Sequence, residues 1–184
     1  MSAELTSIDD GVLSLRPMSV ALMRALAEGR TRDAEQELGA RIASDWSLPC
    51  EVLDMRIGQL EADPRRAGWL LHAIVLKAER LMIGNVGFHG PPGEHIFEER
   101  WPKVVELGYD IVWGYRRRGY ASRAASLLID WARAQGAAQV VMSIALDNEP
   151  SQRTADKLGF ALVERYEHDA RGLSLLYGLR LFAG

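Results

Sequence analysis

The chain of 184 residues has the length of one domain with a sizeable core. Hydrophobic residues make up 48% and charged residues 26%, which is typical of a globular protein, and the net charge of −3 argues against nucleic-acid binding through a basic surface. The single cysteine, Cys50, excludes an internal disulfide and a cysteine-rich metal cluster.

Targeting and metal-binding signals are missing from the sequence. The first ten residues lack the basic start and apolar block of a secretory signal, and no run approaches the roughly 18 apolar residues of a membrane-spanning helix. The four histidines show no metal-ligand spacing. We therefore expect a single cytoplasmic domain over residues 1–184, with no membrane span and no metal site.

The first half of the chain predicts a short strand, a helical region and a hairpin. Residues 12–17 show an alternating apolar and polar pattern that ends at a proline, which favours a strand. Residues 20–58 have a helical pattern, broken by glycines and a proline, that predicts two helices. Residues 68–77 and 81–88 predict a β-hairpin closed by a short polar turn. His72 lies within this hairpin, where we expect it to be packed and hydrogen-bonded.

The second half begins with a surface loop over residues 90–103, which is rich in proline, glycine and charge. A strand follows over residues 104–113, and on it Glu106 and Asp110 share one face. His89, just before the loop, lies close enough to a strand end to be a remote site candidate.

The rest of the chain alternates helices and strands. An apolar-periodic helix ends near Gly136, a strand covers residues 139–145, and a short helix begins near Asn148. Strands over 161–168 and 173–181 flank a turn. The fold class predicted is α/β of the α+β type: a mixed, mostly antiparallel sheet of about six to seven strands, with about four helices.

The most informative segment is the arginine- and glycine-rich turn between the strand at 104–113 and the helix after it. Such a turn directs unpaired backbone N–H groups and the positive helix end at one point, which suits a phosphate or pyrophosphate. The alternative is that Gly114 and Gly119 only permit a tight connection. Three consecutive arginines favour the anion site, because like charges beside a positive helix end oppose folding unless an anion neutralises them.

The residues around Gly119 also restrict the type of phosphate ligand. Tyr120 and Ala121 stand where a nucleotide triphosphatase needs a lysine and a magnesium-binding hydroxyl, and the dinucleotide fingerprint G-x-G-x-x-G is absent. A nucleotide-phosphate binder is therefore disfavoured. The turn predicts a phosphate site that works without magnesium.

Three motifs in order resemble the GNAT superfamily of acetyl-CoA-dependent N-acetyltransferases. Arg116-Arg-Arg-Gly-Tyr-Ala121 matches the family pattern Arg/Gln-x-x-Gly-x-Gly/Ala. Asn148-Glu-Pro-Ser151, then Lys157-Leu-Gly-Phe160, together with the earlier Glu106-Leu-Gly-Tyr109, look like the branch that includes the ribosomal-protein N-terminal acetyltransferases. The resemblance is firm over residues 84–160 and loose in the first 60 residues.

This resemblance implies a GNAT-like domain whose sheet is splayed at the cofactor site, and acetyl-CoA as the co-substrate. Backbone amides of the turn cradle the CoA pyrophosphate, Arg116 charges the pocket, and Ser122 adds a hydroxyl. Asn148 hydrogen-bonds the pantetheine arm, caps the short helix, or does both. The cofactor-binding residues expected are Val112, Arg116, Arg117, Arg118, Gly119, Tyr120, Ala121, Ser122, Asn148 and Ser151.

Acetyl transfer to an amine needs a base, an oxyanion donor and an acid. Glu106 is the first candidate for the base and Asp110 the weaker one; each is otherwise a solvated strand carboxylate. A backbone N–H near Val112 is the expected oxyanion donor. Ser151 is the candidate acid, although capping explains a serine at this position equally well. Tyr166 is a possible substitute for it.

The function expected is direct transfer of the acetyl group to a primary amine, either a protein N-terminus or a small molecule such as a polyamine, amino acid or aminoglycoside. The alternative is a non-catalytic acyl-CoA sensor on the same scaffold. Family members are often homodimers, which the resemblance extends to this chain. We expect no nucleic-acid or membrane partner.

Overall fold

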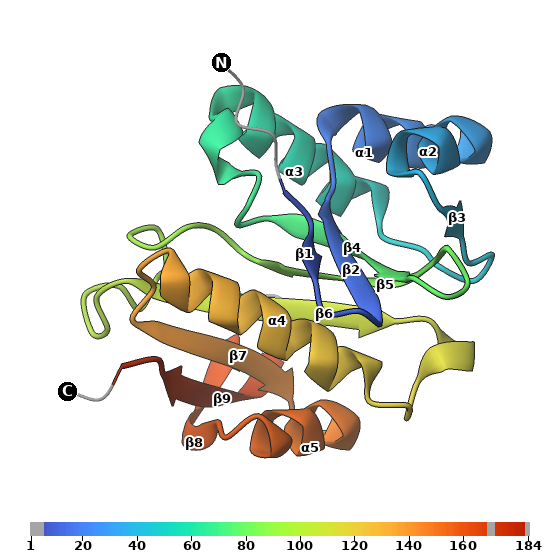
Figure 1. The fold of residues 1–184 in the computed structure, drawn as a ribbon. Coiled ribbons are helices and arrows are strands. Elements are labelled where there is room, and N and C mark those ends of the chain that lie inside the picture. Colours follow the sequence, from blue (N-terminus) through green and yellow to red (C-terminus); the bar gives the residue numbers. More distant parts are fainter. Residues whose placement is uncertain (1–5, 169–171, 183–184) are drawn as a thin grey trace.

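The computed structural model describes residues 6–168 and 172–182, which form one mixed sheet with helices on both faces (Figure 1). The order of the strands is β1-β2-β4-β5-β6-β7-β9-β8, with β3 paired to β5 outside this path. The strands are β1 (Ile8–Asp9), β2 (Leu13–Pro17), β3 (Arg41–Ile42), β4 (Leu71–Leu76), β5 (Leu81–Phe88), β6 (Val104–Ile111), β7 (Gln139–Ala145), β8 (Ala161–His168) and β9 (Gly172–Arg180).

Five α-helices lie within the described residues, and local signals set where several of them begin. The Ser19 side chain caps the first helix by accepting from the Leu22 N–H, and the Asn148 side chain caps the last by accepting from the Ser151 N–H. The helices are α1 (Val20–Ala27), α2 (Thr31–Leu38), α3 (Cys50–Ala62), α4 (Tyr120–Ala134) and α5 (Glu149–Lys157), with 3₁₀ turns η1 (Pro64–Arg66) and η2 (Trp113–Tyr115).

Two apolar cores lie on opposite faces of the central strands, because alternate residues of a strand point to opposite sides. On one face α1, α2 and α3 cover Ala73, Val75 and Met82. On the other face α4 packs its Ala124, Leu128 and Ala132 against the hairpin and β6. Leu107 and Ile111 of β6 belong to the α4 core, so Glu106, Gly108 and Asp110 face away from α4.

The sheet opens between its two central strands. β6 and β7 pair in parallel only from Val104 to Glu106, opposite residues 139–141. Beyond this point β6 stays paired with β5 as far as Ile111, and β7 stays paired with β9 as far as Ala145. A wedge-shaped gap therefore begins immediately after Glu106, and the splayed sheet expected from the sequence is confirmed.

The predicted fold class is confirmed, with differences in the number of elements. The described sheet has nine strands rather than six or seven, because β1 and β3 are two residues long and too short to show an alternating pattern. Residues 20–58 hold two complete helices and most of a third, since α3 begins at Cys50. The strand predicted to reach residue 113 ends at Ile111. Most of the turn expected at 169–172 lies outside the described residues.

Two predictions about single residues are also confirmed. His72 is 1% exposed and its Nδ1 lies 3.1 Å from the Leu70 carbonyl. Gly136 follows directly after the C-cap of α4 with φ of 89°, a conformation that glycine adopts without strain. Among the described residues no helix is long and apolar enough to cross a membrane.

Candidate functional site

The turn before α4 has the backbone geometry of an anion cradle. Arg117 and Gly119 both adopt left-handed conformations, with φ of 61° and 82°, and α4 starts at Tyr120 without a side-chain cap. The first N–H groups of a helix have no intrahelical partners, and they point outward along the positive end of its dipole. The turn therefore presents several donors to one point, as expected from the sequence.

A cation from a distant segment stands beside these donors. Lys157, at the end of α5, places its Nζ 3.2 Å from the Ser122 Oγ and close to Gly119. The two groups line an open cavity of about 490 Å³ that Arg118 also borders. The sequence motif contained Lys157, but its spacing alone did not indicate that α5 returns to the start of α4.

The three arginines of the turn differ in their contacts. Arg116 donates from Nε to the Ile111 carbonyl at 2.6 Å and from Nη2 to Asp110 at 3.1 Å, so it ties the turn to the end of β6. Arg118 lies over the Tyr115 ring and borders the cavity. The oxyanion donor was expected near Val112; the N–H of Val112 itself bonds to the Ile83 carbonyl at 2.9 Å and is already used within the sheet.

A second group of polar side chains surrounds Glu106, at the end of the gap where β6 and β7 are still paired. This carboxylate is 7% exposed, and its Oε2 lies 3.0 Å from both His89 Nδ1 and His95 Nε2. Burial opposes the charged form. Hydrogen bonds donated by the two histidines and by the Ser143 hydroxyl outweigh burial and hold the pKa of Glu106 well below its usual range.

The network continues through β7 and β8. The Tyr166 hydroxyl donates to the Ser143 Oγ at 2.6 Å, and Ser143 is a hydrogen-bond partner of Glu106. The chain from Tyr166 to Glu106 joins side chains of β8, β7 and β6, with β9 lying between β8 and β7, and it ends at the point where β6 and β7 part. It brings the possible substitute acid into hydrogen-bonded connection with the first candidate base.

The loop over residues 90–103 supplies one of the two histidines. It folds back over the face of β6 that points away from α4, where Phe97 and Trp101 pack against the buried Val104. His95 contacts Glu106 from this loop, on the same face of β6. Sequence analysis assigned His95 no role, because neither its position in a surface loop nor its spacing from Glu106 indicated contact.

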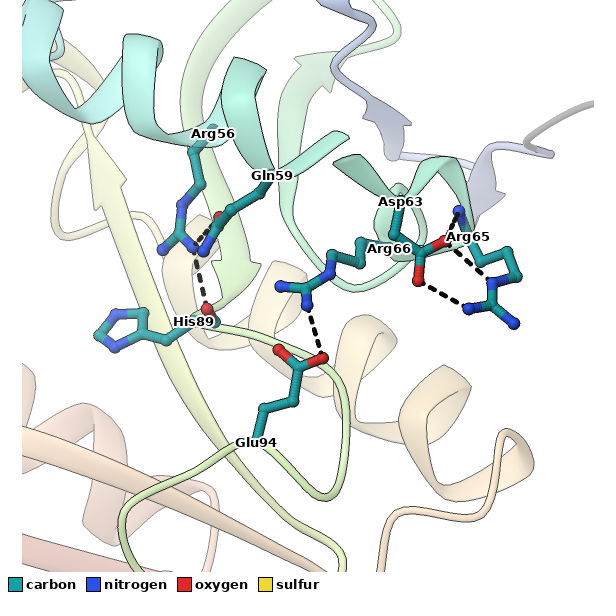
Figure 2. A network of polar contacts seen from close by, with 7 residues as sticks. All are labelled: Arg56, Gln59, Asp63, Arg65, Arg66, His89 and Glu94. Carbon is teal, nitrogen blue, oxygen red and sulfur yellow. Dashed lines mark hydrogen bonds and ion pairs between the residues drawn. The ribbon is translucent and has the colours of Figure 1, made fainter. Parts of the chain in front are cut away.

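Polar contacts also anchor the beginning of this loop, as Figure 2 shows. Arg56 of α3 is 6% exposed and donates from Nη1 to the His89 carbonyl at 2.9 Å and to Gln59 at 2.8 Å. Burial lowers the pKa of Arg56, an effect that the negative charge of Glu106 counters. Arg66 forms an ion pair of 2.8 Å with Glu94. These contacts hold the end of β5 and the loop against α3.

The other expected catalytic residues lie apart from Glu106. Asp110 is four residues further along β6, about 13 Å at the usual rise of a strand, and is half exposed in its ion pair with Arg116. Ser151 lies in the first turn of α5, where its N–H is 3.2 Å from the Asn148 side-chain oxygen. Asn148 thus acts as a helix cap, which leaves its amide NH₂ for another partner.

The residues present fit acetyl-CoA. The turn and Lys157 suit a pyrophosphate, and the gap between β6 and β7 leaves strand edges that an extended amide-containing arm can pair with. The hydroxyl of Tyr109 on β6 is buried and has no hydrogen-bond partner among the described residues. A buried orphan donor of this kind is costly unless a ligand satisfies it. Within the described residues no group of His, Cys, Asp and Glu could hold a metal ion.

Comparison with known proteins decides the family. The model of the GNAT acetyltransferase domain matches residues 13–161. The chain belongs to the GNAT acetyltransferase family. A relative in Bacillus subtilis, the uncharacterized N-acetyltransferase YjdG, is 29% identical over 169 residues, which cover 85% of this chain and 92% of YjdG.

Solved GNAT structures share the fold. The ribosomal-protein-S5-alanine acetyltransferase from Vibrio fischeri superposes with a TM-score of 0.67 at 19% identity, covering 95% of this chain and 96% of the other. RimL, a ribosomal L7/L12 α-N-protein acetyltransferase solved with coenzyme A, gives a TM-score of 0.67 at 17% identity, with coverage of 95% and 97%. The family resemblance stated from the sequence is thus confirmed.

Proposed function

We propose that this GNAT protein transfers the acetyl group of acetyl-CoA to a primary amine by direct attack, without a metal. One observation carries the proposal: β6 and β7 part immediately beyond Glu106, between the uncapped start of α4 at one end and a buried carboxylate network at the other. An extended thioester bound at the turn would reach this network through the gap. The reaction needs a proton acceptor there, and the network contains titratable groups.

The proposed roles follow the contacts. The amides of residues 117–121, with Ser122 and Lys157, bind the pyrophosphate, and Asn148 uses its remaining amide protons on the pantetheine arm. Glu106 is the carboxylate of the reaction centre, and Asp110 is the weaker candidate because of its distance and exposure. Ser151 is the candidate acid, and it lies beside Asn148 in the first turn of α5, the helix that follows β7. Acetyl-CoA supplies the activated acyl group.

The acceptor proposed is either a protein N-terminus or a small amine. The names of the two ribosomal-protein acetyltransferases support the first, although their low identity leaves the acceptor of this chain to experiment. A cytoplasmic homodimer is part of the proposal, and light scattering coupled to size-exclusion chromatography tests the dimer.

The proposal is tested by measuring thiol release from acetyl-CoA against a panel of spermidine, kanamycin, free amino acids and hexapeptides that begin with alanine or serine. We expect at least one amine to accelerate release and Glu106→Gln to abolish that acceleration while CoA still binds. Calorimetry should show binding of CoA but not of ATP. If CoA binds and no amine accelerates release, the sensor alternative is correct instead.

A further inference from the structure

The two histidines on Glu106 have different hydrogen-bond environments. His95 donates from Nε2 to Glu106, and its Nδ1 accepts from the Phe97 N–H at 3.2 Å. Both nitrogens are therefore used, and an additional proton on Nδ1 would meet the Phe97 N–H. The side chain of His95 is also only 10% exposed. These contacts fix the His95 ring against Glu106, and its function is to position that carboxylate.

His89 uses only one of its nitrogens. An ionised carboxylate can only accept, so the contact of His89 Nδ1 with Glu106 places the proton of the neutral ring on Nδ1. The lone pair is then on Nε2, for which no hydrogen-bond partner occurs among the described residues. The His89 side chain is 38% exposed, so this nitrogen is accessible to a ligand.

The ring of His89 lies over the part of β6 that borders the gap. Its Nε2 is 3.3 Å from the position that a Cβ would take on Gly108, two residues beyond Glu106. The ring occupies this space because Gly108 has no side chain. Figure 2 shows the ring pointing away from the Arg66–Glu94 ion pair, while Arg56 holds the backbone carbonyl of His89.

On the basis of the proposed function, we propose that His89 Nε2 accepts the proton of the attacking amine and that Glu106 acts through His89 as a positioning residue. A carboxylate that holds one ring nitrogen fixes the tautomer and stabilises the imidazolium that forms. The C–N bond forms and the C–S bond breaks. Of the two N–H protons that the ammonium gives up, one passes to His89 and then to water, and the other ends on the CoA thiol.

The surroundings of His89 suit this task better than those of Glu106. Imidazole groups ordinarily titrate near neutral pH, where a general base is most effective. The buried carboxylate is stabilised in its charged form by its donors, which makes it a weak base. Among the described residues, the titratable or charged groups around His89 are Glu106 from β6, His95 from the loop, which shares the Glu106 oxygen, and Arg56 from α3, which holds the His89 backbone carbonyl.

The test compares His89→Gln with the matched variant His95→Gln, using the fastest amine of the panel above. For the wild type we expect kcat at saturating substrates to rise with pH along a one-proton limb in the imidazole range. His89→Gln should lower kcat about 100-fold or more and remove this limb, with the KM for acetyl-CoA unchanged. His95→Gln should lower kcat less than about 10-fold and keep the limb. Added imidazole should restore turnover to His89→Ala.

Different results would overturn different statements. If His89→Gln keeps the wild-type kcat and limb, or if both glutamine variants lose the same activity with the same pH profile, His89 is not the proton acceptor. Nitrogen-15 NMR of the wild type should place the ring proton of His89 on Nδ1, and a proton on Nε2 also refutes the inference without any turnover. If the wild type uses no amine, the proposed function fails first and this inference falls with it.

Discussion

Lys157 offers the sharpest test of the phosphate site, because it reaches the turn from another helix. Replacement by methionine keeps an unbranched side chain of similar length, one atom shorter, and removes its charge. A hydrogen bond to a charged group contributes about 1.5–3 kcal/mol, and about 1.4 kcal/mol corresponds to a tenfold change in affinity. Lys157 is exposed, so solvent screening favours the lower end of that range. We expect Lys157→Met to raise the Kd of CoA about 10-fold at low salt.

Isothermal titration calorimetry with CoA and with 3′-dephospho-CoA measures this effect. The loss of affinity in Lys157→Met should be the same for both ligands, since we place Lys157 beside the pyrophosphate. This loss should become smaller as the salt concentration rises. Arg153→Met is the matched control, because Arg153 lies one turn earlier on α5 and pairs with Glu149 at 3.0 Å instead. An unchanged Kd in Lys157→Met, or a loss that disappears with dephospho-CoA, would refute this reading of the turn.

Two further predictions concern single residues of the central strands. Burial lowers the pKa of His72 to about 4, so the unfolded state takes up a proton more readily, and stability falls as pH drops from about 6.5 to about 4. We expect the free energy of unfolding of the wild type to fall by about 2 kcal/mol between pH 7 and pH 5, and that of His72→Gln to fall by less. Urea unfolding at several pH values measures both, and the same pH dependence in the two proteins would contradict this. Gly108→Ala should displace the His89 ring and lower kcat about 10-fold at unchanged CoA affinity, whereas Gly114→Ala, with open space around it, should not. Wild-type kcat in Gly108→Ala would count against a role for His89.

Much of the fold could be predicted from the sequence because its signals are local. The β4–β5 hairpin, the strand–turn–helix unit around Gly119 and the Asn148 cap each depend on residues a few positions apart. Periodicity and capping residues encode such elements directly. The short strands β1 and β3 escaped prediction because two residues carry no period, and they pair only where neighbouring strands present an edge.

The sequence singled out the turn before α4 and Glu106, but it did not indicate several of the side chains that lie beside them. Glu106 was identified on its strand, but His95 lies 11 residues before it in a loop, and Tyr166 comes from β8. Lys157 joins Ser122 across 35 residues. No spacing rule links such positions.

The sequence by itself determined the strand–turn–helix unit around Gly119 and the family, because consecutive residues set backbone conformation and helix start. Only the tertiary structure decided which side chains meet at Glu106, where the sheet opens, and which histidine keeps a nitrogen accessible. These properties depend on strand order, register and the path of a loop, which are fixed by the packing of the whole chain and not by neighbouring residues.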